Sequence, residues 1–256
     1  MTTTRLPLFP LNTVLFPGLV LPLNVFEARY RAMMRDLLEL PGEGPRPFGV
    51  VAIRDGHEVA PSALGLPDGP EPPEGGAGAG FAPDPIRSFH GVGCIADAST
   101  IRARPSAGGG AEEDDAEGYE VLATGTTRFR LLSVHAEGPY LTADVEPLPE
   151  VAGEGAGALA SGVLRAFRAY QKVLAGANER TLAPGQELPE DPSVVSYLVA
   201  AATMLYTADK QRLLQARDTA TRLAEELRIL RQETSLIGRL PSVPGAEYTT
   251  RPTSLN

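Results

Sequence analysis

The chain has 256 residues, of which 43% are hydrophobic and 21% charged, and its formal net charge is −9. This size and apolar content allow one large domain or two modest ones with a packed core, and they exclude a collagenous or wholly disordered chain. The single cysteine, Cys94, cannot form an internal disulfide bond, which excludes a disulfide-stapled secreted domain and favours the cytoplasm.

The longest apolar stretch, at residues 14–26, does not predict a membrane helix. Two prolines interrupt it, and it is shorter than the roughly 20 apolar residues that span a bilayer. The N-terminus also lacks the continuous apolar core and small-residue cleavage site of an export signal. We therefore expect no membrane partner.

The first half of the chain, residues 1–150, predicts a β-rich domain. Runs of apolar and β-branched residues, some alternating with polar ones, indicate strands at 48–53, 91–101, 119–124, 128–134 and 139–145. Two segments rich in glycine, proline and acidic residues, about 62–85 and 105–118, predict flexible insertions between strands.

The second half predicts a helical bundle at residues 151–241, followed by a flexible tail at 242–256. Apolar residues recur at helical spacing across 158–176. Asp191 and Pro192 have the pattern of an N-cap followed by a first helical residue. We therefore expect this half of the chain to be all-helical.

Two further helices are expected after the helix that begins at Pro192. Asp209 is expected to cap a short helix, and Asp218 or Thr219 to cap a longer one that ends before Pro241. The longer helix carries leucines at 223, 227 and 230. This leucine stripe predicts packing within the chain, and the alternative is a coiled-coil seam.

The sequence contains no motif of a known catalytic class. It has no Gly-Lys pair for a phosphate-binding loop and no Gly-x-Ser-x-Gly elbow, and its three histidines are scattered without a second pair of metal ligands. Cys94 is expected to be a small buried residue, and Lys172 and Lys210 are expected on solvated helix surfaces. We therefore expect no enzymatic activity, no cofactor and no metal.

The distribution of charge disfavours nucleic acid as a partner. Much of the acidic excess lies in the glycine- and proline-rich segments, above all at 112–117, while the rest of the chain is close to neutral. Binding of nucleic acid requires a basic face that displaces counterions, and the sequence shows no dense cluster of lysine and arginine.

The motif LPLFPLNTVLFPG at residues 6–18, continued by LPLNVFEARY at 21–30, closely resembles the opening of the N-terminal substrate-binding domain of Lon proteases. The resemblance continues in order over about residues 5–240. The later matching pieces are Phe48-Gly49-Val50-Val51, Gly91-Val92-Gly93, Gly125 with Arg128-Phe129-Arg130, Pro139-Tyr140, Asp209-Lys210-Gln211-Arg212-Leu213-Leu214 and Arg222-Leu223.

The resemblance implies an α+β fold in which an N-terminal PUA-like β pseudo-barrel is followed by a C-terminal helical bundle. In the full protease this domain recognises unfolded or tagged polypeptides, and separate ATPase and peptidase domains act on them. Neither of those domains is expected in this chain. The resemblance thus implies a non-catalytic polypeptide-binding or adaptor module in protein quality control, which could work with a separate protease.

The expected binding surface consists of Phe16, Leu19 and Val20, at a turn where apolar side chains can stay exposed and capture unfolded segments. The alternative is that these side chains pack inward. Two other functions remain open from the sequence, namely an RNA-binding PUA-like module and a stand-alone hydrolase of unrecognised type.

Overall fold

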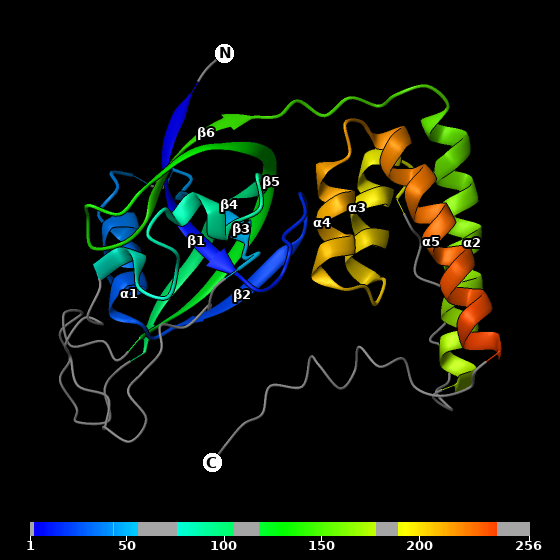
Figure 1. Cartoon of the computed structure of the whole chain (residues 1–256), viewed down its shortest axis with the longest axis horizontal. Coiled ribbons are helices and arrows are strands. Elements are labelled where there is room, and N and C mark those ends of the chain that lie inside the picture. Colours follow the sequence, from blue (N-terminus) through cyan, green and yellow to red (C-terminus); the bar gives the residue numbers. More distant parts are fainter. Residues whose placement is uncertain (1–2, 43, 56–75, 105–117, 178–188, 240–256) are drawn as a thin grey trace. The chain divides into compact units, whose positions relative to one another are not determined.

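The computed structural model describes residues 3–42, 44–55, 76–104, 118–177 and 189–239 (Figure 1). These residues belong to two compact units that divide between Pro149 and Glu150. In the described residues, the first unit holds six strands and one α-helix, and the second unit holds four α-helices. The fold is therefore of the α+β class, with a mixed sheet.

The first unit is built on a single sheet. Its six strands follow the order β2-β5-β4-β3-β1-β6, and β1 is parallel to β3 while the other pairs are antiparallel. β5 also pairs with β6, so the pairing from β5 through β4, β3, β1 and β6 closes into a ring. The elements are β1 (Thr4–Leu11), β2 (Val20–Val25), α1 (Ala28–Leu38), β3 (Pro47–Ala52), η1 (Gly76–Gly78), η2 (Pro85–Ser88), β4 (Val92–Arg104), β5 (Gly118–His135) and β6 (Thr142–Pro147).

β5 joins what the sequence predicts as two strands, 119–124 and 128–134, into one strand of 18 residues. Its first part pairs with β2, its last part pairs with β6, and β4 runs antiparallel to residues 118–130 of it. A register shift lies opposite the middle of β5, between Ile95 and Ala96. Such a shift increases the local bend of the paired strands, so one strand can serve several neighbours.

Two apolar clusters fill the first unit. Alternate residues of β1 enter different clusters: Phe9 packs with Tyr30 and the methionines of α1, whereas Leu8 packs with Phe129 and the apolar residues of β6. This alternation follows from the two-residue period of a strand, whose side chains point to opposite faces. Both faces of β1 are therefore buried.

Residues 77–81, which lie within an expected flexible insertion, instead pack onto the first unit. Ala77 is buried, and the carbonyl oxygens of Ala77 and Ala79 accept hydrogen bonds from the buried Arg29 side chain at 3.3 and 2.8 Å. The guanidinium of Arg29 also lies 5.6 Å from the ring centroid of Phe81. Residues 62–75 and 105–117 of the two expected insertions and the expected tail at 242–256 lie outside the described residues.

The second unit consists of α2 (Ala156–Ala177), α3 (Pro192–Ala202), α4 (Thr207–Gln215) and α5 (Thr219–Arg239). The Asp191 cap is confirmed, because its carboxylate accepts hydrogen bonds from the backbone N–H groups of Ser193 and Val194 at 2.8 and 3.2 Å. Asp218 likewise accepts from the N–H of Thr221 at 2.7 Å, at the start of α5. Both carboxylates satisfy donors that a helix start leaves unpaired.

The prediction that Asp209 caps α4 is wrong. The N-cap position is occupied by Tyr206, three residues earlier, so the helix begins at Thr207 and Asp209 lies in its first turn. There its carboxylate pairs with Arg212 at 2.8 Å, one turn further along the helix. An acidic residue in a first turn is favoured by the helix dipole as well as at the cap, so the two positions look alike in sequence.

The leucine stripe of α5 packs within the second unit. Leu223 and Leu230 are buried beside Val163, Phe167 and Tyr170 of α2, and Leu227 packs against the same cluster. This burial accounts for the stripe through contacts inside the chain, as predicted.

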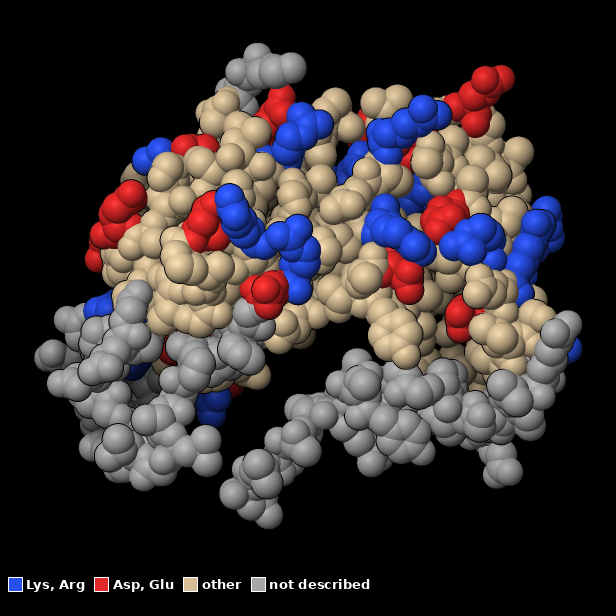
Figure 2. Space-filling model, viewed as in Figure 1, with Lys and Arg blue, Asp and Glu red and all other residues tan. Residues whose placement is uncertain are grey.

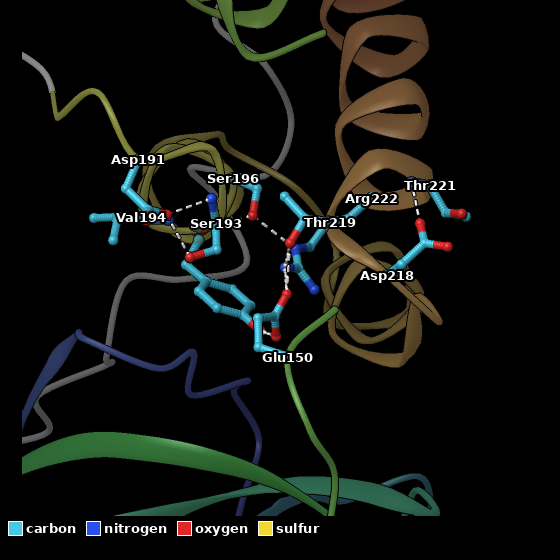
Figure 3. A network of polar contacts seen from close by, with 10 residues as sticks. Glu150, Asp191, Ser193, Val194, Ser196, Asp218, Thr219, Thr221 and Arg222 are labelled. Carbon is cyan, nitrogen blue, oxygen red and sulfur yellow. Dashed lines mark hydrogen bonds and ion pairs between the residues drawn. The ribbon is translucent and has the colours of Figure 1, made fainter. Parts of the chain in front are cut away.

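A buried polar network fixes the start of the second unit to α3 and α5 (Figure 3). The Arg222 side chain is fully buried, and it donates to Glu150 at 2.6 Å and to Ser196 at 2.8 Å. Thr219 donates to Glu150 at 2.7 Å, Tyr197 donates to the same carboxylate, and the Arg222 guanidinium lies 4.0 Å from the centroid of the Tyr197 ring.

The charge on Glu150 is stabilised by this network. Burial alone would raise the pKa of the Glu150 carboxyl, but hydrogen bonds from Thr219 and Tyr197 and the charge of Arg222 bring it below its usual value. Glu150 is therefore the anion that compensates a buried guanidinium.

Replacing Glu150 with alanine is expected to destabilise the second unit by about 3 kcal/mol, because it leaves a buried cation without its counter-charge. The measurement is urea unfolding at neutral pH, followed by far-ultraviolet circular dichroism. Glu154→Ala, four residues further along at an exposed position, is the matched control and should change stability little. Equal effects of the two substitutions would contradict the role assigned to Glu150.

Candidate functional site

A tight turn connects residues 14–16 to β2 and positions the expected binding surface. The backbone N–H of Leu19 donates to the carbonyl oxygen of Phe16 at 3.2 Å, across Pro17 and Gly18. Gly18 has a φ of 77°, in the left-handed region that side chains other than glycine rarely adopt. Proline followed by such a glycine is the pattern of a type II turn, so the sequence itself specifies this reversal.

Gly125 of β5 holds this turn by two backbone hydrogen bonds. Its carbonyl oxygen accepts from the N–H of Gly18 at 2.8 Å, and its N–H donates to the carbonyl oxygen of Leu19 at 2.9 Å. A Cβ atom at Gly125 would lie 2.4 Å from the carbonyl oxygen of Phe16, which is closer than any stable contact. The turn is thus seated directly on the β5 backbone.

The three residues expected to form the surface have different environments. Phe16 is 1% exposed, so the expectation that its side chain is exposed is wrong; the turn folds it inward. Leu19 is half-buried and packs against the core cluster that contains α1. Val20 is 56% exposed and is the member of the set that is open to solvent.

Val20 belongs to an apolar surface that extends onto the neighbouring strand. In the antiparallel pairing of β2 with β5, Val20 lies opposite Thr124 and Pro22 lies opposite Leu122. Pro22 is exposed and Leu122 is 44% exposed. We call the set of Val20, Pro22 and Leu122 the β2–β5 apolar face.

Leu122 is exposed but was not among the binding residues predicted from the sequence. Residues of β5 alternate between buried Val121 and Ala123 and exposed Leu122, a pattern that predicts a polar residue at the exposed position. A leucine at a solvent-facing position of an alternating strand was the available signal. Phe26, which follows β2, is also 59% exposed.

β2 pairs with β5 alone among the described strands, so its other edge carries no strand there. Pro22 lies in the middle of this edge strand and has no N–H group to offer an incoming strand. This edge is therefore a poor template for adding a β-strand. Contacts to the β2–β5 apolar face must come mainly from side chains.

Charged groups beside this surface are of both signs. Glu120 of β5 lies opposite Asn24 on one side and opposite Arg102 on the other, and Arg104 approaches it at 3.9 Å. Elsewhere Arg5, Arg130 and Arg228 pair with carboxylates, and Figure 2 shows Lys and Arg interspersed with Asp and Glu on the face it presents. Beside the apolar face, Arg104 of β4 therefore partly offsets the charge of Glu120.

The structure brings together Ser133, His135 and Asp144, which the sequence pattern does not connect. Nε2 of His135 lies 3.0 Å from Oγ of Ser133 and 2.8 Å from Oδ2 of Asp144, and Ser133 donates to Asp144 at 2.8 Å. In a hydrolase triad the two ring nitrogens face different partners, one the carboxylate and one the nucleophile. Here one nitrogen faces both, which is not triad geometry.

Arg5 explains this cluster as an ion-pair network. Its guanidinium donates to both carboxylate oxygens of Asp144 at 2.8 and 3.0 Å. The hydrogen bonds from Arg5, His135 and Ser133 hold the pKa of Asp144 well below its usual range. The cluster ties β1, β5 and β6 together, and the pairing of these strands is the signal that would have revealed it.

Cys94 and the two lysines have no arrangement suited to nucleophilic catalysis. Burial raises the pKa of the Cys94 thiol to about 12, which keeps it protonated and unreactive. Lys172 is exposed, as expected, but Lys210 is half-buried instead of solvated. Its ammonium group donates to the carbonyl oxygen of Ala201 at 3.2 Å, and burial lowers its pKa.

Within the described residues, no three or more His, Cys, Asp or Glu side chains are grouped so that they could hold a metal ion. None of the helices in the described part of the chain is long and apolar enough to cross a membrane.

Comparison with known proteins places residues 5–232 in the family model of the ATP-dependent protease La (LON) substrate-binding domain. A curated relative, Lon protease 2 of Sorangium cellulosum strain So ce56, is 26% identical over 262 aligned positions. The match covers 96% of this chain but 28% of that protein, so the chain spans little more than a quarter of the relative's length.

Two solved structures share the fold. The crystal structure of a Lon N-terminal domain protein from Xanthomonas campestris has a TM-score of 0.50 and 21% identity, over 88% of this chain and 98% of that one. The N-terminal domain of Mycobacterium avium complex Lon protease has a TM-score of 0.51 and 19% identity, over 91% and 98%. With the family model matched over most of its length, the chain belongs to the LON substrate-binding domain family.

Proposed function

We propose that this chain is a polypeptide-binding module whose contact surface is the β2–β5 apolar face. The observation that carries the proposal is the exposure of Val20 and Leu122, diagonal neighbours on one face of the β2–β5 pair, on a domain of a family named for substrate binding. Neighbouring exposed apolar groups form an interaction site on a folded domain, because together they lose contact with water when a partner covers them, whereas single exposed apolar residues are ordinary.

The geometry supports capture of unfolded segments through their apolar side chains. Pro22 stands where an incoming strand would need a donor, while Val20 and Leu122 offer contact to any apolar side chain of suitable size. Such contacts carry little directional demand, so clients of different sequence can share the surface. The ordered turn at Pro17 and Gly18 keeps Val20 in place before a client arrives.

The proposal includes the finer features that the family resemblance implies. The ring of pairing closed by β5 and β6 supports a PUA-like pseudo-barrel in the first unit, and the cluster shared by α2, α3 and α5 supports a helical bundle in the second. The chain acts in the cytoplasm without catalysis of its own, as an adaptor in quality control that passes clients to a separate protease.

Replacing Val20 or Leu122 with aspartate is expected to weaken client binding about tenfold, the loss typical of an important interface side chain. The probe is a fluorescently labelled, permanently unfolded protein, reduced and carboxymethylated lactalbumin, and the readout is fluorescence anisotropy. Leu132→Asp is the matched control, because Leu132 lies on the same strand with the same 44% exposure, ten residues from Leu122. It should bind the probe like the unmodified chain.

Three outcomes separate the possibilities. Loss of affinity in Val20→Asp and Leu122→Asp but not in Leu132→Asp supports the surface. Equal loss of affinity in all three variants indicates non-specific apolar binding to the whole surface and contradicts a defined site. No binding of the probe by the unmodified chain overturns the proposed function itself.

RNA binding is expected to be absent. A carboxylate lies beside several exposed arginines of the described chain and partly offsets their charge, at positions 5, 87, 130, 212, 217 and 228. The most basic helix face is that of α2, with exposed Arg165, Arg168 and Lys172. A filter-binding titration with single-stranded RNA should show no retention at physiological salt. Retention that falls steeply with salt and is lost in Arg165→Glu/Arg168→Glu would replace the polypeptide role.

A further inference from the structure

Glu226 of α5 is a buried acid without a partner. The residue is 2% exposed. Neither of its carboxyl oxygens has a hydrogen-bond partner in the described part of the protein. Buried carboxyl groups in proteins are normally paired or hydrogen-bonded, because an isolated buried charge is strongly disfavoured. Glu226 is therefore an exception that needs an explanation.

The surroundings of Glu226 are almost wholly apolar. The space next to it lies between α3, α4 and α5 and is too small to hold a water molecule. The remaining residues that line it are Ala200, Thr203, Leu205, Leu213, Ile229 and Leu230. A hydrated ion or an organic cation cannot enter without moving the helices, so the cation that fits the carboxylate in this packing is a proton.

The charged groups of the surrounding helices are committed to other partners. Arg222, one turn before Glu226 on α5, donates to Glu150 and Ser196 and forms no ion pair with Glu226. On α4, Lys210 donates to the carbonyl oxygen of Ala201, and Arg212 pairs with Asp209 and Glu225. The sequence of α3 contains no Asp, Glu, Lys, Arg or His.

Two groups nearby bear on any titration of this region. Tyr170 of α2 accepts a hydrogen bond from the N–H of Met204 through its hydroxyl. Glu233 of α5 is half-buried, and desolvation and the charge of Asp209 raise its pKa as well. Burial also raises the pKa of Glu226 well above its usual value, opposed in part by the charge of Arg222. Because both acids have a raised pKa, any measurement has to separate the titration of Glu233 from that of Glu226.

We propose that Glu226 is a proton-binding site that makes the packing of α3, α4 and α5 depend on pH. The folded helices hold the carboxyl group in its protonated form, whereas the unfolded chain releases that proton at an ordinary pKa of about 4.3. The folded unit thus binds one more proton than the unfolded chain at pH values between the two pKa values.

The sign of the effect follows from this difference. The helical unit has its full stability below the unfolded-state pKa and loses stability as the pH rises toward the folded-state pKa. Each unit by which the folded-state pKa exceeds the unfolded-state value corresponds to about a tenfold change in the unfolding equilibrium constant. A rise in pH therefore loosens α5 from α3 and α4.

The test compares the full chain with Glu226→Gln, which replaces the carboxyl group by a neutral group of the same shape. Urea unfolding is followed at 222 nm between pH 4 and pH 8. Glu226→Gln is expected to match the unmodified chain near pH 4, below the unfolded-state pKa, and to unfold at higher urea concentration at pH 8. Nuclear magnetic resonance of glutamate carboxyl carbons in the unmodified chain gives the pKa directly, with Glu226→Gln identifying the resonance.

Two neighbouring variants serve as controls. Glu225→Gln removes a carboxylate whose pKa is lowered by its hydrogen bond with Arg228, so this variant should lose stability at pH 8. Glu233→Gln measures the contribution of the other half-buried acid. If Glu226→Gln follows the same pH dependence as the unmodified chain, or if the Glu226 carboxyl titrates near 4.3, the proposal is overturned.

Discussion

The stacking of Phe129 on two glycines sets the spacing of the central strands of the first unit. A Cβ atom at Gly93 would lie 2.3 Å from the carbonyl oxygen of Val50 and 2.4 Å from the ring of Phe129, so no side chain fits there. At Gly49 the ring would lie 3.3 Å from an added Cβ atom. The ring therefore packs directly on the backbones of β3 and β4, and β5, which carries it, is held at a fixed distance from both.

The position of β5 in turn determines where the β2–β5 apolar face lies. Because Gly125, four residues before Phe129, accepts and donates the backbone hydrogen bonds that seat the turn at Gly18, the register of β2 depends on that of β5. A shift of one residue would exchange the buried and exposed residues of β2. The exposure of Val20 thus depends on the core packing at Gly49 and Gly93, through the position of β5 and the hydrogen bonds of Gly125.

Elements with strong local signals could be predicted from the sequence, and those decided by tertiary contacts could not. Asp191-Pro192 carries its own capping signal, which the structure confirms, whereas Asp209 serves equally well in a first turn, so its exact place depends on Arg212. Phe16 illustrates the second case. Its neighbours predict a turn, but whether its ring points inward depends on β5, which lies more than 100 residues further along the chain.

The two ionisable residues buried in α5 show how the same helix can hold a charge and exclude one. Arg222 and Glu226 are one turn apart and equally buried, and spacing places Glu226 on the face of Leu223 and Leu230. Arg222 forms an ion pair with Glu150 at the start of the second unit, and this pair holds the segment around Glu150 against the helices. Glu226 faces Thr203 and apolar side chains, none of which supplies a positive charge, so its own charge is removed by a proton instead. A leucine at this position would fill the same space without linking the packing to pH.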